Sequence, residues 1–252
     1  MKRNKCKRCL ILFLILSLMM TMMPSTVLAL DETIADTAEE LIQAVGAGGT
    51  VKLDSDIVLS DTLTINEGVT ATIDLNGHTL TSGAVTAIDV TGEGTKLVIC
   101  DSNGQDGMII AGYDSSKTKA LWIKSGALAE LQSGTIKVGN PEAEQDIYCA
   151  SNAAFTMTGG RIESGNSSWI NTIGTGNVSF EGGRIYAPGA NSINSRYYDK
   201  AANAVVREKD GAFTVVDKDK APEDFNVNYG NSYYDCFGTI SNATSAIYNT
   251  YK

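Results

Sequence analysis

An all-β solenoid with three short strands per turn is the fold that three features of this sequence predict. The first is internal repetition: segments 128–138, 154–164 and 178–187 align, and their corner glycines lie 26 and 23 residues apart. Repeats of this length belong to architectures whose units bury an apolar face only by stacking. The second is strict alternation of apolar and polar residues within each unit. The third is composition, because 25 glycines beside 4 prolines suit a turn-rich β protein better than a helical one.

The alternation predicts which side chains lie inside the solenoid, because successive side chains of a strand point to opposite faces. Three interior positions, counted from the corners at Gly134, Gly160 and Gly183, recur as apolar files. A third strand precedes each unit, and counting three residues back from Gly126, Asn152 and Gly176 gives a fourth file. These files are Leu131/Met157/Phe180, Ala129/Phe155/Val178, Ile136/Ile162/Ile185 and Ile123/Cys149/Ile173. We therefore expect consecutive turns to pair as parallel strands, about 4.8 Å apart.

Residues 1–29 predict a secretory signal peptide, with a basic start, an apolar core from Leu10 to Met20 and small residues before position 29. The apolar run is short for a helix that spans a membrane. Removal of segment 1–29, which carries five basic residues, changes the formal net charge from −9 to −14. A protein with this net negative charge is not expected to bind nucleic acid or an anionic membrane. We expect a secreted protein, extracellular or associated with a cell surface.

Residues 30–48 predict a short N-terminal capping α-helix. Thr37 and Glu40 have the spacing of a capping box, an apolar stripe follows them, and Gly46 is the expected end of the helix. Such a helix is too short to be stable alone in water, so it must dock on another element. The open end of a solenoid exposes its core and its unpaired strand edges, and we expect the helix to cover that end.

Residues 49–217 contain the repeated strands and form the predicted solenoid domain. Its early turns are compact, the middle turns carry longer loops, and segments 203–206 and 212–216 are expected to form one last turn. Residues 218–252 are predicted to be a linker and a tail rich in tyrosine and asparagine, which could cover the other end of the stack.

The Gly-Gly-Arg-Ile corners at 159–162 and 182–185 and the segment TIDLNGHTL at 72–80 resemble those of secreted β-helix modules from bacterial surface proteins. The whole pattern resembles the right-handed parallel β-helix of the pectate-lyase-like superfamily. The resemblance covers residues 50–216, and it implies a right-handed winding. It leaves the activity open, because one scaffold hosts many functions.

For an enzyme, the resemblance implies carboxylates from neighbouring turns, which hold calcium in the lyases and act as an acid and a base in the hydrolases. In this sequence the outward acids Glu130, Glu163 and Glu181 do not share one file. His78 is the only histidine, and no GxSxG segment supplies a nucleophile for it to activate. No pair of cysteines with zinc-site spacing remains after removal of the leader. We therefore expect no catalytic residue, no metal site and no cofactor.

Arg161 and Arg184 occupy the same outward position on consecutive turns and are the first candidates for ligand binding. Two guanidinium groups one strand apart repel each other unless carboxylates or a ligand lie between them. Glu163 and Glu181 are near enough in sequence to supply such carboxylates, and Tyr186 could stack against a sugar beside the arginines.

Trp122 and Trp169 are the remaining candidates, because each flanks an interior file and could present its ring as a sugar platform. Partial burial under the neighbouring loops is the competing interpretation. Taken together, these features predict a secreted, non-catalytic β-helix module that binds carbohydrate or another component of a cell surface, with a polysaccharide or surface glycan as its partner. The alternatives are a polysaccharide lyase or glycoside hydrolase, and a truncated piece of a larger adhesin.

Overall fold

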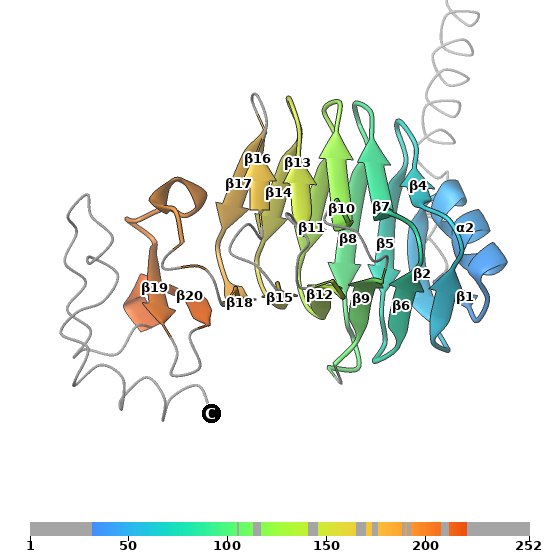
Figure 1. Cartoon of the computed structure of the whole chain (residues 1–252), viewed down its shortest axis with the longest axis horizontal. Helices are drawn as coiled ribbons and strands as arrows, with labels where there is room; N and C mark the ends of the chain where they lie inside the picture. Colours follow the sequence, from blue (N-terminus) through green and yellow to red (C-terminus); the bar gives the residue numbers. More distant parts are fainter. Residues whose placement is uncertain are drawn as a thin grey trace, which may run out of the picture. The chain divides into compact units, whose positions relative to one another are not determined.

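The computed structural model describes residues 32–220, apart from 105, 113–116, 141–145, 165–169, 173–175, 188–189, 191–192 and 208–211. The predicted signal peptide, Trp169, Ile173 and most of the predicted tail therefore lie outside the described residues. In the described part, short strands stack side by side in three sheets, with one α-helix at the N-terminal end (Figure 1). The prediction of an all-β parallel solenoid with one short helix is confirmed.

The three sheets take their strands in a fixed rotation along the chain. Sheet A contains β1 (Thr33–Ala35), β2 (Gly49–Leu53), β5 (Thr70–Asp74), β8 (Lys96–Cys100), β11 (Leu128–Leu131), β14 (Ala154–Met157) and β17 (Asn177–Phe180). Sheet B contains β3 (Ile57–Leu59), β6 (Thr79–Ser82), β9 (Met108–Ala111), β12 (Thr135–Val138), β15 (Arg161–Glu163) and β18 (Gly183–Tyr186), followed by β20 (Phe213–Asp217) and β19 (Asn203–Arg207). Sheet C contains β4 (Leu63–Ile65), β7 (Thr86–Thr91), β10 (Lys119–Lys124), β13 (Ile147–Cys149) and β16 (Ile170–Thr172).

Three of the four predicted interior files are confirmed by the strand register. Members of each file pair directly across neighbouring parallel strands, and every member is at most 4% exposed. These files are Leu131/Met157/Phe180, Ala129/Phe155/Val178 and Ile136/Ile162/Ile185. Burying each large apolar side chain in such a column contributes about 1.5–3 kcal/mol to folding.

The fourth file is wrong at its last member. Ile123 and Cys149 pair as predicted, but Cys149 pairs next with Thr172 rather than with Ile173. The error came from treating Gly176 as the equivalent of Gly126. In the register of sheet A, Gly176 directly precedes β17 as Ala127 precedes β11, so the count was displaced by one residue.

Helix α2 (Ala38–Ala47) covers the N-terminal end of the stack, as predicted, and contacts strands of all three sheets. The Thr37 hydroxyl accepts a hydrogen bond from the Glu40 amide at 3.3 Å, and the Glu40 carboxylate accepts one from the Asp36 amide at 3.1 Å. The helix ends at Ala47 and is capped by Gly48, with φ 81°, and does not end at Gly46. Strand β1, which precedes the helix and pairs in parallel with β2, was not predicted.

The C-terminal end is closed differently from the prediction. Segments 203–206 and 212–216 were expected to form a last solenoid turn, but β19 and β20 form an antiparallel hairpin, and β20 runs antiparallel to β18. The short helix η1 (Ser195–Tyr197) covers β17, where the Tyr197 ring meets the Phe180 ring edge-on at 5.8 Å. Residues 218–220, predicted to begin a linker, form a second short helix, η2 (Lys218–Lys220).

Where sheet A turns into sheet B, consecutive turns are joined by a buried carboxylate. Asp101 is 7% exposed, and its two oxygens accept hydrogen bonds from the amides of Gly77 at 2.7 Å and Gly107 at 3.0 Å. The Ser133 hydroxyl accepts a hydrogen bond from the Asp101 amide at 2.6 Å. The side chain of Asp101 thus joins its own turn to the preceding one, and its backbone amide joins the following turn through Ser133.

Replacement of Asp101 by alanine is expected to lower the free energy of unfolding by about 2–3 kcal/mol, because two backbone donors lose a charged acceptor and one of them is buried. Asp54→Ala is the matched control, since Asp54 is an exposed carboxylate at an earlier corner. Chemical denaturation of both variants measures the difference. Equal midpoints would show that the Asp101 contacts do not stabilise the corner.

Candidate functional site

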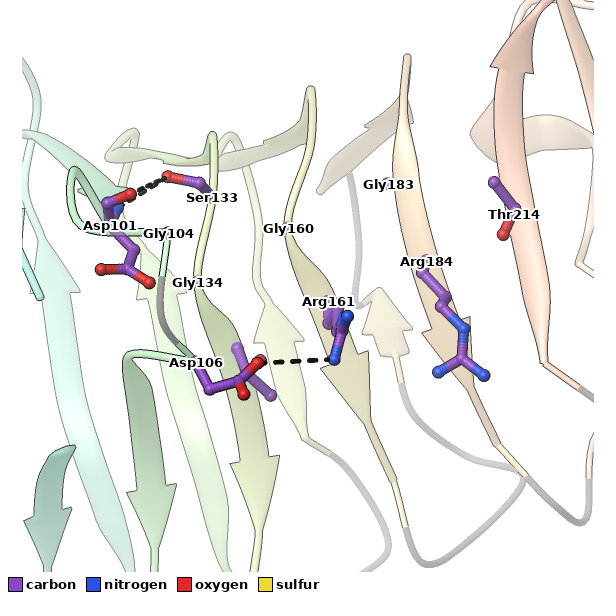
Figure 2. Close-up of a pocket in the computed structure, with 11 residues that line it drawn as sticks. Asp101, Gly104, Asp106, Ser133, Gly134, Gly160, Arg161, Gly183, Arg184 and Thr214 are labelled. Atoms are coloured by element: carbon purple, nitrogen blue, oxygen red, sulfur yellow. Dashed lines mark hydrogen bonds and ion pairs between the residues drawn. The ribbon is translucent and has the colours of Figure 1, made fainter. Parts of the chain in front are cut away.

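A groove of about 410 Å³ lies along the corner between sheets A and B, toward the C-terminal end of the solenoid (Figure 2). Its floor is formed by the corner glycines of β12, β15 and β18, and its charged side chains are Asp101, Asp106, Arg161 and Arg184. Thr214 of the C-terminal hairpin lines it at the far end. The hairpin and the solenoid therefore both contribute to this groove.

The floor is bare backbone because the turns approach each other closely there. Gly160 and Gly183 have φ values of 71° and 94°, a region that side-chain-bearing residues rarely adopt. A Cβ at Gly160 would lie 2.7 Å from the carbonyl oxygen of Gly134, and one at Gly183 would lie 2.8 Å from that of Gly159. The corner thus requires glycine, and the arginines that follow each glycine are the groups that project into the groove.

Arg161 and Arg184 are paired in register on β15 and β18, as the sequence predicted. Figure 2 shows both guanidinium groups on the same side of the sheet, toward the open groove. The Nη1 atom of Arg161 lies 3.8 Å from the Oδ1 atom of Asp106, whose side chain is 82% exposed. An ion pair this exposed contributes about 0–1 kcal/mol, so a ligand can displace it at little expense.

Glu163 and Glu181 do not supply the carboxylate that was expected beside the arginines. Glu163 pairs across the strands with Lys137 and Tyr186, and its Oε2 atom lies 3.9 Å from the Nζ atom of Lys137. Glu181 instead accepts a hydrogen bond from the hydroxyl of Ser179 at 3.5 Å. The loop residue Asp106 takes the place expected for them.

Tyr186 lies two residues after Arg184 on the same outward side of β18 and is partly exposed, but it pairs with Glu163 and is not among the residues that line the groove. Trp122, by contrast, lies on the outer face of sheet C, in β10. The predicted ligand-binding residues therefore do not form one site, because the arginines and Tyr186 belong to sheet B. The other tryptophan candidate, Trp169, falls outside the described residues.

The outward-facing carboxylates of sheets A and B do not stack in one file, as the sequence register predicted. Glu130 pairs with Thr156, which pairs in turn with Ser179, and no second carboxylate joins this file on β14 or β17. The Glu130 carboxylate lies 3.0 Å from the Nζ atom of Lys96. Hydrogen bonds from Gln132 and Lys96 lower the pKa of Glu130, which keeps it ionised.

The surroundings of His78 and of the two described cysteines indicate structural rather than catalytic roles. The Nδ1 atom of His78 lies 3.5 Å from the Oδ1 atom of Asp56, which also accepts a hydrogen bond from the Thr79 amide. Cys100 and Cys149 are free thiols, and burial raises the pKa of each to about 11. Both thiols are therefore protonated at neutral pH and are poor nucleophiles.

Within the described part of the chain, no group of three or more histidine, cysteine, aspartate and glutamate side chains is placed to hold a metal ion. The helices that the structure describes are all too short or too polar to cross a lipid bilayer. Comparison with known proteins gives no match among family models, curated sequences or solved structures. The arrangement of the groove is thus the principal guide to function.

Two residues beside the candidate ligand-binding residues, Asp106 and Tyr148, were not predicted from the sequence. Asp106 reaches Arg161 from a loop whose path no repeat determines, so no sequence signal could have placed it. Tyr148 pairs with Trp122 on sheet C. The sequence repeat is sufficient to predict this pairing, because each of the two residues directly precedes a member of the Ile123/Cys149 pair.

Proposed function

We propose that this protein is a secreted, non-catalytic solenoid module, of the kind found in bacterial surface proteins of the pectate-lyase-like type, that binds an acidic polysaccharide in the groove. The observation that carries the proposal is the pairing of Arg161 with Arg184 along a floor of glycine backbone. A guanidinium group binds a carboxylate through two parallel hydrogen bonds, which gives both affinity and orientation.

The spacing of the two arginines suits a polymer of acidic sugars. Neighbouring parallel strands lie about 4.8 Å apart, an interval similar to the length of one sugar unit. The glycines of the floor present backbone rather than side chains to a sugar ring in the groove.

Binding rather than catalysis is supported by the way the carboxylates of the groove are used. Asp101 accepts two backbone hydrogen bonds that join turns of the solenoid, and Asp106 is paired with Arg161. Asp101 is therefore not free to exchange a proton with a substrate. Asp106 is released when a ligand displaces it from Arg161, but one carboxylate is not the acid and base pair that glycoside hydrolysis requires.

Replacement of either arginine by glutamine is expected to weaken binding of a linear hexauronate about 10- to 150-fold, because each change removes a charge-assisted pair worth about 1.5–3 kcal/mol. Asp106→Asn is expected to strengthen binding a few-fold, because the ligand no longer competes with Asp106 for Arg161. Titration calorimetry measures each affinity, and the neutral hexasaccharide maltohexaose tests the need for charge.

Lys52→Gln is the matched control, since Lys52 lies on sheet A and its charge faces Glu32 at 4.0 Å. Unchanged affinity in both arginine variants would contradict the proposal. Release of shortened products from the hexauronate, abolished by a single acid-to-amide change, would favour a lyase or hydrolase instead.

A further inference from the structure

A second polar and aromatic cluster lies on the outer face of sheet C, apart from the groove. We call it the sheet C cluster; its members are Asp89 on β7, Lys119, Trp122 and Lys124 on β10, and Tyr148 on β13. Trp122 pairs in register with Asp89 on one side and with Tyr148 on the other. The two rings meet edge-on, with centroids 6.1 Å apart.

Both lysines of the cluster lie against the rings. The Nζ atom of Lys124 is 3.9 Å from the centroid of Trp122, and that of Lys119 is 5.7 Å from the centroids of both rings. Lys124 also forms an ion pair with Asp89 through the Oδ2 atom. The cluster thus concentrates two cations and two aromatic rings on one face of a strongly acidic protein.

Two polar atoms of this cluster have no hydrogen-bond partner. They are the indole nitrogen of Trp122, a donor, and the Oδ1 atom of Asp89, an acceptor, and each has less than 1 Å² of exposed surface. Leaving such a group unpaired costs about 1–3 kcal/mol. Because Asp89 and Trp122 pair across neighbouring strands, the unused donor and acceptor lie on adjacent strands of one face.

We propose that the sheet C cluster is a second binding site, which takes a sugar ring that carries an acidic group. An unused donor beside an unused acceptor matches the hydroxyl groups of a sugar, each of which can both accept and donate a hydrogen bond. The rings of Trp122 and Tyr148 offer apolar surface to the C–H face of the sugar. Lys119 and Lys124 supply positive charge to its acidic group.

The Lys124 ammonium group now occupies the Trp122 face on which the sugar would stack. A cation at this position gains about 0.5–2 kcal/mol from the ring, and the lysine side chain is long and flexible. On binding, the ammonium group moves from the ring to the acidic group of the sugar and stays close to Asp89. Binding also requires the groups that cover the indole N–H and the free carboxylate oxygen to move aside, because both atoms are buried in the unbound chain.

The site is independent of the groove, because its residues lie on sheet C and the paired arginines lie on sheet B. Its existence therefore goes beyond the proposed function. If both sites bind the same polymer, binding at one raises the effective concentration of ligand at the other, and long chains bind more tightly than short ones.

The test uses the full mature chain and a diuronide as probe, which is too short to reach both sites. We expect two equivalents bound by calorimetry in the unmodified chain, and one equivalent in Trp122→Ala. Trp122→Phe keeps an aromatic ring but loses the N–H donor, and it is expected to weaken that step about tenfold. Thermal melting of each variant checks that it is folded.

Fluorescence then locates the site. The chain has two tryptophans, so Trp169→Phe leaves Trp122 as the single reporter. The diuronide is expected to change its emission, and it should still do so when Arg184→Gln is added. If the groove does not bind the diuronide but the sheet C cluster does, calorimetry shows one bound equivalent, and Trp122→Ala abolishes it. Unchanged Trp122 emission at saturating diuronide would overturn the second site. So would a result in which Trp122→Phe and Trp122→Ala both bind the diuronide as the unmodified chain does.

Discussion

Replacement of Ile162 by aspartate is expected to unfold the solenoid under conditions in which the unmodified chain is folded. Ile162 is fully buried and pairs with Ile136 on one side and Ile185 on the other. An unpaired buried carboxylate costs several kcal/mol, and the lost burial of the isoleucine adds about 1.5–3 kcal/mol. The sum is comparable with the whole stability of an ordinary domain, about 5–15 kcal/mol. Circular dichroism during thermal unfolding measures the loss.

Val58→Asp is the matched control for this change. Val58 is also a β-branched residue on sheet B, but its side chain points outward and is 71% exposed. The same substitution there is expected to change stability by no more than about 0.5 kcal/mol. If the two variants melted at the same temperature, the assignment of Ile162 to the interior column would be wrong.

The interior columns could be predicted because two independent signals agree on them. Alternation fixes which residues of a strand point inward, and a corner glycine fixes where the next strand begins. At Gly134, Gly160 and Gly183 both signals were present, and the predicted files were correct. Beside sheet C the corner residues differ from turn to turn, and counting from Gly176 displaced Ile173 by one position.

Strand direction was the information that the pattern lacked at the C-terminal end. Segments 203–206 and 212–216 alternate in the same way whether they continue the parallel stack or turn back as a hairpin. Strand β20 of the hairpin pairs with β18, and Thr214, the partner of Arg184 in this pairing, lines the groove. This part of the candidate site could not be derived from the repeat.

The arginine pair was predictable for the same reason as the interior columns, since a residue that follows an equivalent glycine occupies an equivalent place. The ion partner was not, because Asp106 belongs to a loop outside the repeat and has φ 54°. The sequence repeat thus predicted the positions of the two arginines in the groove. The position of the loop carboxylate that pairs with Arg161 could be learned only from the structure.

Stability is expected to fall as the pH rises from about 4 to about 7, because of one carboxyl group at the start of β13. Asp146 is completely buried, and neither of its carboxylate oxygens has a hydrogen-bond partner of normal geometry. Burial raises the pKa of Asp146 from 3.8 to about 7, and the nearby Ser164 hydroxyl acts weakly in the opposite direction.

The sign of the effect follows from which state holds the proton. Below pH 3.8 the carboxyl is protonated in both states, and stability is unaffected by it. Between that pH and about 7 the unfolded chain is ionised while the folded chain still holds a proton, so rising pH favours unfolding. Over the full interval the loss amounts to roughly 3–5 kcal/mol, at 1.36 kcal/mol per pKa unit.

Asp146→Asn isolates this contribution, because asparagine has nearly the same shape and does not ionise. We expect the variant to be more stable than the unmodified chain at pH 8 and nearly equal to it at pH 4, as measured by urea denaturation across this range. Asp61→Asn, at an exposed loop carboxylate, controls for the loss of one negative charge. A difference between Asp146→Asn and the unmodified chain that stayed constant from pH 4 to pH 8 would contradict the raised pKa. A difference that grows with pH would show that this solenoid tolerates an unpaired carboxyl in its interior by keeping it protonated.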